Sequence, residues 1–133
     1  MYLLDTNIVS EARRGSPEAT AWIRSIKGRV LHVSVITLGE IMRGIQVKER
    51  KDPKAAAILA EWLIALRELH RETVLPVTEA VALDWGRLSA DRSRNTADGL
   101  IAATARVHDL ILVTRNVTDF EDTGVSIINP WNL

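Results

Sequence analysis

Met1-Tyr2-Leu3-Leu4-Asp5-Thr6-Asn7, residues 1–7, is the stretch that decides the fold. A short apolar run that ends in a carboxylate and leads directly into a helix is typical of a buried strand in an open α/β protein. Because this strand is wholly apolar and starts the chain, we expect it at the centre of the sheet. Asp5 at its end is the first candidate for a functional acid.

Strands and helices alternate along the rest of the chain. Apolar runs predict further strands at residues 30–35, 74–77, 110–113 and 125–128. Helical periodicity fills the segments between them, with the longest helix predicted over residues 53–72, and Asn7 is expected to cap the first helix. This order predicts an α/β fold in one domain over residues 1–133, with a mainly parallel central sheet flanked by helices in three layers, α/β/α.

Composition and charge narrow the class of protein. Of the 133 residues, 47% are hydrophobic and 26% are charged, which is ordinary for a globular domain. The chain has no cysteine, which excludes disulfides and thiolate metal sites. Lys plus Arg and Asp plus Glu both number 17, so a nucleic-acid partner would have to be held by local basic groups. The apolar runs are too short to span a bilayer, and we expect a cytoplasmic protein without a membrane partner.

Four acids come from four separate segments near the ends of predicted strands: Asp5, Glu40, Asp98 and Asp119. In open α/β folds, ligands bind beyond the carboxyl ends of the strands. Packing like charges together is costly unless a cation neutralises them, and oxygen ligands without Cys or clustered His favour Mg²⁺, or Mn²⁺. Such an ion suits phosphodiester hydrolysis, because it activates water and stabilises the leaving oxygen.

Three of the four acids also have a structural explanation, whereas Asp5 is the hardest to explain in this way, because an acid directly after Leu3-Leu4 would be partly buried. Asp98 could stabilise a helix N-terminus, Glu40 could pair with Arg43 on a helix surface, and Asp119 could form a turn. Their joint placement favours the metal site. A phosphatase that forms an aspartyl phosphate also has Asp after its first strand, but it requires a second Asp two residues on, where this chain has Asn7.

Four blocks of sequence resemble a PIN domain. They are Leu3-Leu4-Asp5-Thr6-Asn7, Ser34-Val35-Ile36-Thr37-Leu38-Gly39-Glu40 with Gly44, Thr96-Ala97-Asp98-Gly99-Leu100-Ile101-Ala102-Ala103-Thr104-Ala105 and Thr114-Arg115-Asn116-Val117-Thr118-Asp119-Phe120. Within that superfamily the chain is similar to the VapC-type toxins of bacterial toxin–antitoxin pairs, in particular the FitB-like branch, which the ending Ile128-Asn129-Pro130-Trp131 also resembles. The resemblance implies a Mg²⁺-dependent endoribonuclease that is the toxin of a type II toxin–antitoxin system.

The resemblance also implies roles for individual residues. The four acids would be catalytic, with Asp5 and Asp98 as direct ligands of Mg²⁺ (Mn²⁺ as the alternative) and with Glu40 and Asp119 acting through water or a second metal. Polar residues around them would orient the carboxylates and water: Thr6, Asn7, Thr114 and Asn116. Arg115 would contact a phosphate of the RNA substrate, with an ordinary surface arginine as the alternative. A cognate antitoxin and a homodimer are the expected protein partners.

Two function classes stay open at this point. One is the Mg²⁺-dependent ribonuclease toxin, and the other is a catalytically inactive PIN-like module that binds RNA or protein. The helix predicted over residues 53–72 carries Ala55, Ala56 and Trp62 beyond its main apolar stripe. This surface indicates either a deeply buried helix or a groove for a partner helix or a second copy.

Overall fold

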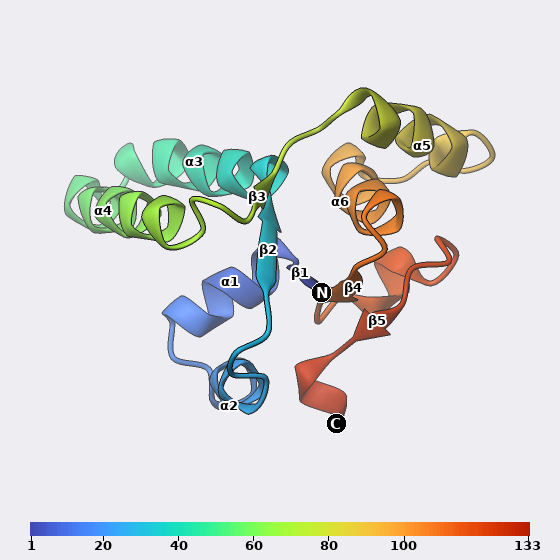
Figure 1. Cartoon of the computed structure of the whole chain (residues 1–133). Coiled ribbons are helices and arrows are strands. Elements are labelled where there is room, and N and C mark those ends of the chain that lie inside the picture. The colour runs from blue at the N-terminus through green and yellow to red at the C-terminus, as the bar shows by residue number, and fades with distance from the viewer.

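A single parallel sheet forms the middle layer in the computed structural model, which describes residues 1–133 (Figure 1). Its strands are β1 (Tyr2–Leu4), β2 (Leu31–Ser34), β3 (Val74–Leu75), β4 (Ile111–Val113) and β5 (Ile127–Ile128). They lie in the order β3-β2-β1-β4-β5, and every neighbouring pair is parallel. The predicted α/β class and the central position of the first strand are therefore confirmed.

The strand order places the reversal of the chain beside β1. The first three strands extend the sheet from β1 towards β3, and the chain then crosses to the other side of β1 to form β4 and β5. In such sheets the carboxyl ends of the strands at the reversal form the ligand-binding crevice. The segments that follow β1 and β4 meet at this point, because Leu4 is in register with Val113.

Helices cover both faces of the sheet. Four of them, α1 (Thr6–Arg13), α2 (Pro17–Ser25), α3 (Val35–Glu49) and α4 (Pro53–Leu69), lie on one side in Figure 1. The other side is covered by α5 (Glu79–Ser89) and α6 (Thr96–Val107), and the 3₁₀ turns η1 (Val117–Phe120) and η2 (Pro130–Asn132) follow β4 and β5. None of the helices combines the length and the apolar character needed to cross a bilayer.

Burial on both faces explains why β1 is continuously apolar. Leu4 packs into a core with α1 to α4, whereas Leu3 packs into a second core with α5 and α6. The small residues of α6 let this helix lie close to the sheet, since Ala102 and Ala103 are fully buried. The three-layer α/β/α arrangement follows from these two cores.

One predicted helix ends earlier in the structure. The long helix ends at Leu69 and not near residue 72, and α5 ends at Ser89. At the end of α5 the Arg94 guanidinium donates to the carbonyl of Leu88 at 3.0 Å, which satisfies one of the acceptors left free at a helix terminus. The chain between α5 and α6 is thereby tied back onto α5.

Candidate metal and catalytic site

Asp5 stands at the junction of β1 and α1. Its backbone is extended, and it is the N-cap of α1, whose first N–H, that of Thr6, donates to Asp5 Oδ1 at 2.8 Å. The expectation that Asn7 caps this helix is therefore wrong. The helix begins directly after the strand, so the cap position falls on Asp5. Asn7 lies inside the first turn, and its side-chain amide donates to Asp5 Oδ2 at 3.1 Å.

The hydrogen bonds of Asp5 leave its carboxylate with few free lone pairs for a ligand. Oδ2 also accepts from the Thr114 hydroxyl at 2.8 Å, so three donors occupy the carboxylate of a side chain that is only 4% exposed. An ionised carboxylate offers about four lone-pair sites. Three of them are used here, and the remaining one is on Oδ1. Asp5 can therefore supply one further bond, from one oxygen, to a cation or a water molecule.

Thr114 joins the ends of β1 and β4. Its hydroxyl donates to Asp5 and accepts from the Asn7 side chain at 3.1 Å and from the Asn116 N–H at 3.0 Å. Asn7 Oδ1 in turn accepts from the Arg115 N–H at 3.2 Å. These contacts bring together the polar residues proposed from the sequence, with Asn116 taking part through its backbone. They orient the Asp5 carboxylate from both strands.

Thr6 connects this junction to α3. Its hydroxyl donates to Glu40 Oε1 at 2.6 Å and lies 3.0 Å from the hydroxyl of Thr37. Thr37 is fully buried near the start of α3, a helix capped by Ser34. This contact of Thr37 is not predictable from the sequence, because a threonine in a helix gives no signal of a hydroxyl partner 31 residues away. Glu40 itself is exposed.

The charges that act on Asp98 indicate that the four acids lie near one another. It lies in the first turn of α6, where its N–H donates to the side chain of the N-cap Asn95 at 3.2 Å. Partial burial and the charges of the other acids, Asp5, Asp119 and Glu40, raise the pKa of Asp98 to about 6. Asp119 is exposed in η1. Each of the three carboxylates is therefore close enough to disfavour ionisation of Asp98.

The pKa of Asp5 is also raised from its ordinary value. Burial is the main cause, and the charges of Glu40 and Asp119 add to it. The hydrogen bonds from Thr114 and Thr6 act in the opposite direction, because they stabilise the ionised form. A bound divalent cation would relieve the repulsion between the buried Asp5 and the acids around it.

The set of donors fits a hard cation in its chemistry. All four side chains are carboxylates, and oxygen ligands are those that Mg²⁺ and Mn²⁺ prefer. As the side chains stand, however, no three acidic or histidine side chains lie close enough together to hold one ion. Sharing an ion would require rotation of the freer carboxylates towards Asp5, whose hydrogen bonds fix its position.

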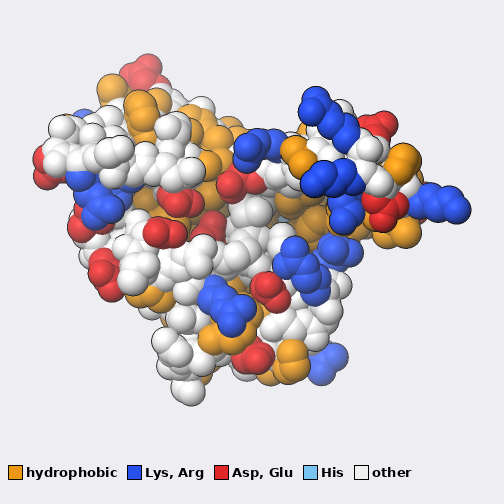
Figure 2. Space-filling view, turned by 180° about the vertical axis from the view of Figure 1, so that it is seen from behind, with side chains coloured by type: hydrophobic (Ala, Val, Ile, Leu, Met, Phe, Trp, Pro, Cys, Tyr) orange, Lys and Arg blue, Asp and Glu red, His pale blue; other side chains and the backbone are white.

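Basic and aromatic groups lie near these acids. Figure 2 shows acidic side chains near the middle of the face opposite to the view of Figure 1, with Lys and Arg side chains around them. The Arg115 guanidinium is stacked on the ring of Trp131 in η2, 4.6 Å from its centroid, and stays exposed to solvent. Further exposed cations lie in the last turn of α3, in the connection to α4 and in the first turn of α4: Lys48, Arg50, Lys51 and Lys54.

A groove of about 570 Å³ extends from the acids between α1, α3 and α4. Thr6 and Glu40 line one end of it, the basic residues include Arg13 and Lys48, and Trp62 belongs to its apolar wall. The guanidinium of Arg13 lies over the Trp62 ring at 5.5 Å from the centroid. Of the apolar residues predicted beyond the main stripe of the long helix, Ala55 and Trp62 line this groove, whereas Ala56 is buried in the core.

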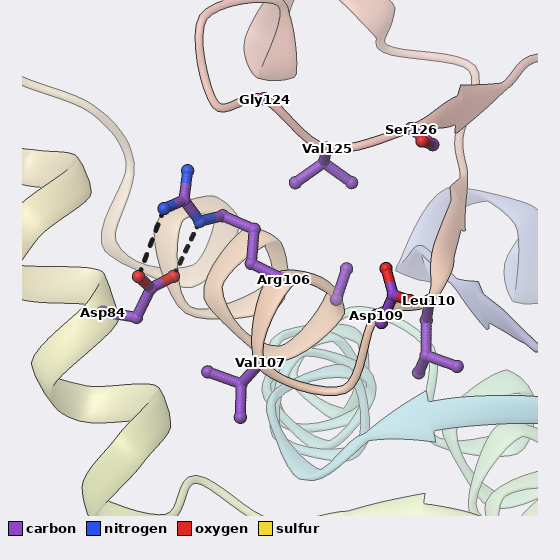
Figure 3. Close-up of a pocket in the computed structure, with 9 residues that line it drawn as sticks. Asp84, Arg106, Val107, Asp109, Leu110, Gly124, Val125 and Ser126 are labelled. Carbon is purple, nitrogen blue, oxygen red and sulfur yellow. Dashed lines mark hydrogen bonds and ion pairs between the residues drawn. The ribbon is translucent and has the colours of Figure 1, made fainter.

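A second polar cavity lies away from the acids. It has about 430 Å³ and is lined by residues of α5, α6 and the segment before β5 (Figure 3). In it Arg106 donates to the two oxygens of the nearly buried Asp84, from Nε at 2.9 Å and from Nη2 at 3.3 Å, and Nη1 donates to the carbonyl of Thr123. This ion pair holds α5 to α6. It was not predicted from the sequence.

Comparison with known proteins agrees with this geometry. Residues 2–125 match the family model described as PIN domain. Toxin FitB of Neisseria gonorrhoeae is 32% identical over 99% of both chains, and VapC ribonuclease Y4jK of Sinorhizobium fredii is 33% identical over 98% of both chains. The crystal structure of FitAcB from Neisseria gonorrhoeae contains a chain with 33% identity and a TM-score of 0.88, and all of each chain is covered.

A parallel sheet with acids beyond the carboxyl ends of its strands is typical of nuclease-like α/β proteins. Within this class the chain belongs to the PIN-domain family. Its similarity to FitB and to a VapC ribonuclease over the whole length confirms the resemblance to VapC-type toxins of the FitB-like branch.

Proposed function

We propose that the protein is a divalent-metal-dependent endoribonuclease that hydrolyses RNA phosphodiester bonds and acts in the cytoplasm as the toxin of a type II toxin–antitoxin system. One arrangement carries the proposal: Thr6, directly after β1, bonds to both Asp5 and Glu40, and Asp98 lies within reach of the charges of Asp5, Glu40 and Asp119 beyond the same edge of the sheet. The names of the full-length relatives, a toxin and a ribonuclease, support the same activity.

The positions of the residues suggest which of them would hold the metal ion and which would orient its ligands. Asp5, through its free lone pair on Oδ1, and Asp98 would hold the ion directly, and Glu40 and Asp119 would complete the site through water or a second ion. When bound, Mg²⁺ or Mn²⁺ supplies an activated water and stabilises charge on the leaving oxygen. Thr114 holds the Asp5 carboxylate at a set angle by donating to Oδ2.

Local cations would bind the RNA, because the net charge of the chain is zero and gives no general attraction. The exposed Arg115, held on Trp131, would contact a phosphate beside the carboxylates. The cations in and beside the connection of α3 to α4 would attract the backbone further along the strand. Because these groups contact phosphates and not base edges, we expect them to set affinity and its salt dependence more than the choice of sequence.

Protein partners belong to the same proposal. A relative named as a toxin and a solved FitAcB structure support a cognate antitoxin for this chain. Large apolar side chains on the outside of α3 and α4 are more than half exposed, including Val47, Ile58, Ile64 and Leu69. Such a surface is suited to a partner helix or to a second copy of the chain, as expected for a homodimer.

Asp98→Asn is the most informative variant for testing the activity. Asp98 is only partly buried, and its carboxylate makes no hydrogen bond within the protein, so its replacement by Asn should leave the fold intact. We expect RNA cleavage with Mg²⁺ or Mn²⁺ that EDTA abolishes, and a loss of at least about 100-fold in Asp98→Asn. Glu72→Gln, which changes an exposed acid before β3, is the matched control and should cleave like the wild type. Equal cleavage by Asp98→Asn and the wild type would refute the proposal.

The alternative is an inactive PIN-like module that binds RNA or protein. It is favoured by the observation that no three acids stand within reach of one ion. Calorimetric titration with Mn²⁺ separates the two functions. Binding that disappears in Asp98→Asn supports the nuclease, whereas the absence of Mn²⁺ binding together with intact RNA binding supports the module.

A further inference from the structure

Arg94 is a buried cation beside the proposed site, in the loop before α6. Its side chain is only 5% exposed, and its two terminal nitrogens donate to the two oxygens of Asp122 at 3.3 and 2.9 Å. Nη2 also donates to the carbonyl of Leu88. A guanidinium so far removed from water is costly unless it is paired, and a bidentate pair with a carboxylate has a defined geometry.

The pair joins two segments that carry proposed catalytic acids. Arg94 lies four residues before Asp98, and Asp122 lies three residues after Asp119. The N-terminus of α6 and the turn after η1 are therefore connected by the same two side chains. Their connection to Leu88 adds the end of α5 as a third fixed point.

Gly99 shows how tightly Arg94 packs against the first turn of α6. A Cβ at this buried glycine would lie 3.2 Å from Cδ of Arg94 and 2.8 Å from Cδ1 of Trp85. Real Cβ atoms do not approach other heavy atoms as closely as 2.8 Å, so any larger residue would displace one of these side chains. The position next to Asp98 therefore has no room for a side chain, because Arg94 and Trp85 occupy the space around it.

Arg92 provides an internal comparison. It also pairs with Asp122, at 3.0 Å, but its side chain is 47% exposed and forms a single contact. Exposed pairs of this kind contribute little to structure, because solvent screens them and the long side chain loses entropy. If the Arg94–Asp122 pair positions the site, Arg92 should be dispensable for that role.

We propose that Arg94 is a positioning residue whose bidentate pair with Asp122 sets the distance between Asp98 and Asp119. The positioning itself is a property of the fold, and its consequence for metal binding rests on the proposed function. Arg94→Lys keeps the charge but replaces the planar fork, in which two nitrogens face the two oxygens of Asp122, by a single ammonium nitrogen on a shorter reach. Arg92→Lys is the matched control.

Amide hydrogen exchange of the metal-free protein tests the positioning independently of activity. The Gly99 N–H bonds to Asn95 and the Asp119 N–H bonds to Asn116, and both amides report on the joined segments. In Arg94→Lys we expect both to exchange about tenfold faster, whereas the Asp5 N–H, bonded to Val113 at 2.9 Å, stays unchanged. Uniformly faster exchange at all three amides would mean that Arg94 only stabilises the fold, and the proposal would be overturned.

Mn²⁺ titration of the same proteins tests the consequence. We expect affinity about tenfold weaker in Arg94→Lys and within about twofold of the wild type in Arg92→Lys. Asp122→Asn should match Arg94→Lys, and the double variant should be no weaker than either single one, because the two side chains act as a unit. Equal losses in Arg92→Lys and Arg94→Lys would overturn the proposal, since they would indicate a general effect of charge.

The two proposals fail in different ways. If the wild-type protein binds no Mn²⁺ while Arg94→Lys loosens the two segments, the proposed function fails and the positioning role of Arg94 stands. If Mn²⁺ binds but Arg94→Lys changes neither the local exchange nor the affinity, the positioning role is wrong and the metal site stands. Gly99→Ala is a second test, because its Cβ would push Arg94 and Trp85 apart and should reproduce the effect of Arg94→Lys.

Discussion

Replacing Asp98 by Asn should stabilise the metal-free protein at neutral pH. Burial and three other acids raise the pKa of Asp98 from 3.8 to about 6, so the folded state binds this proton more tightly than the unfolded chain does. Stability must then fall as the pH rises from about 4 to about 6, where the folded protein is forced to ionise. Asn cannot ionise, and the variant escapes this loss.

The magnitude follows from the size of the pKa change. A rise from 3.8 to about 6 corresponds to about 3 kcal/mol at 1.36 kcal/mol per pKa unit. Asp98 is only partly buried, and solvent screening reduces the expected difference to about 1–2 kcal/mol. At pH 7.5 Asp98→Asn should therefore be more stable than the wild type by this amount, and at pH 4 the two should be nearly equal.

Urea unfolding followed by circular dichroism, with EDTA at pH 4, 5, 6 and 7.5, measures the effect. Glu72→Gln, in which an exposed acid is changed, should stay within about 0.5 kcal/mol of the wild type throughout. Saturating Mn²⁺ should reverse the order, because 100-fold excess over Kd stabilises the wild type by about 2.7 kcal/mol. The reasoning is refuted if Asp98→Asn in EDTA is less stable than the wild type at pH 7.5, or if both lose stability equally with rising pH.

Three further predictions concern metal affinity and buried pairs. Calorimetric Mn²⁺ affinity should fall about tenfold from pH 7 to pH 5, because the pKa of Asp98 is about 6 and the ligand must be ionised; an affinity independent of pH would contradict this. Thr114→Val, which removes a donor to Asp5, should cost about 1–2 kcal/mol in urea unfolding at pH 7 and weaken Mn²⁺ binding about 10-fold or more. Asp84→Asn should destabilise the fold by about 1–2 kcal/mol, since Arg106 is partly exposed, without changing Mn²⁺ affinity.

Much of the fold follows from patterns that are local in the sequence. An apolar strand buried on both faces needs no alternation, and the runs at β1 and β4 have none. The small-residue pattern of α6 predicts its close packing, which the burial of Ala102 and Ala103 bears out. Parallel strands end at a common edge of the sheet. The order of the strands and acids along the chain was therefore enough to predict that Asp5 and Asp98 lie at the same edge.

The errors arise where local signals are equivalent or partners are distant. Asp and Asn are equally good N-caps, so sequence alone did not choose between Asp5 and Asn7, and the exact end of β1 decides. The partners Asp84 and Arg106 are 22 residues apart, and each looks like an ordinary charge on a helix surface. The sequence likewise suggests nothing of the buried contact between Arg94 and Asp122, 28 residues apart.

Asp5 illustrates why site and fold are difficult to separate in this protein. The same carboxylate caps α1, accepts from Asn7, and joins β1 to β4 through Thr114, which leaves one lone pair for a ligand. In Asp5→Asn the amide nitrogen would be placed against donors, so lost activity could reflect a disturbed strand junction as well as a lost ligand. The Asp98 carboxylate makes no comparable hydrogen bonds within the protein, and its replacement by Asn should relieve its repulsion by the other three acids. A variant that gains stability while it loses Mn²⁺ binding separates the two roles, and Asp98→Asn, unlike Asp5→Asn, is expected to behave in this way.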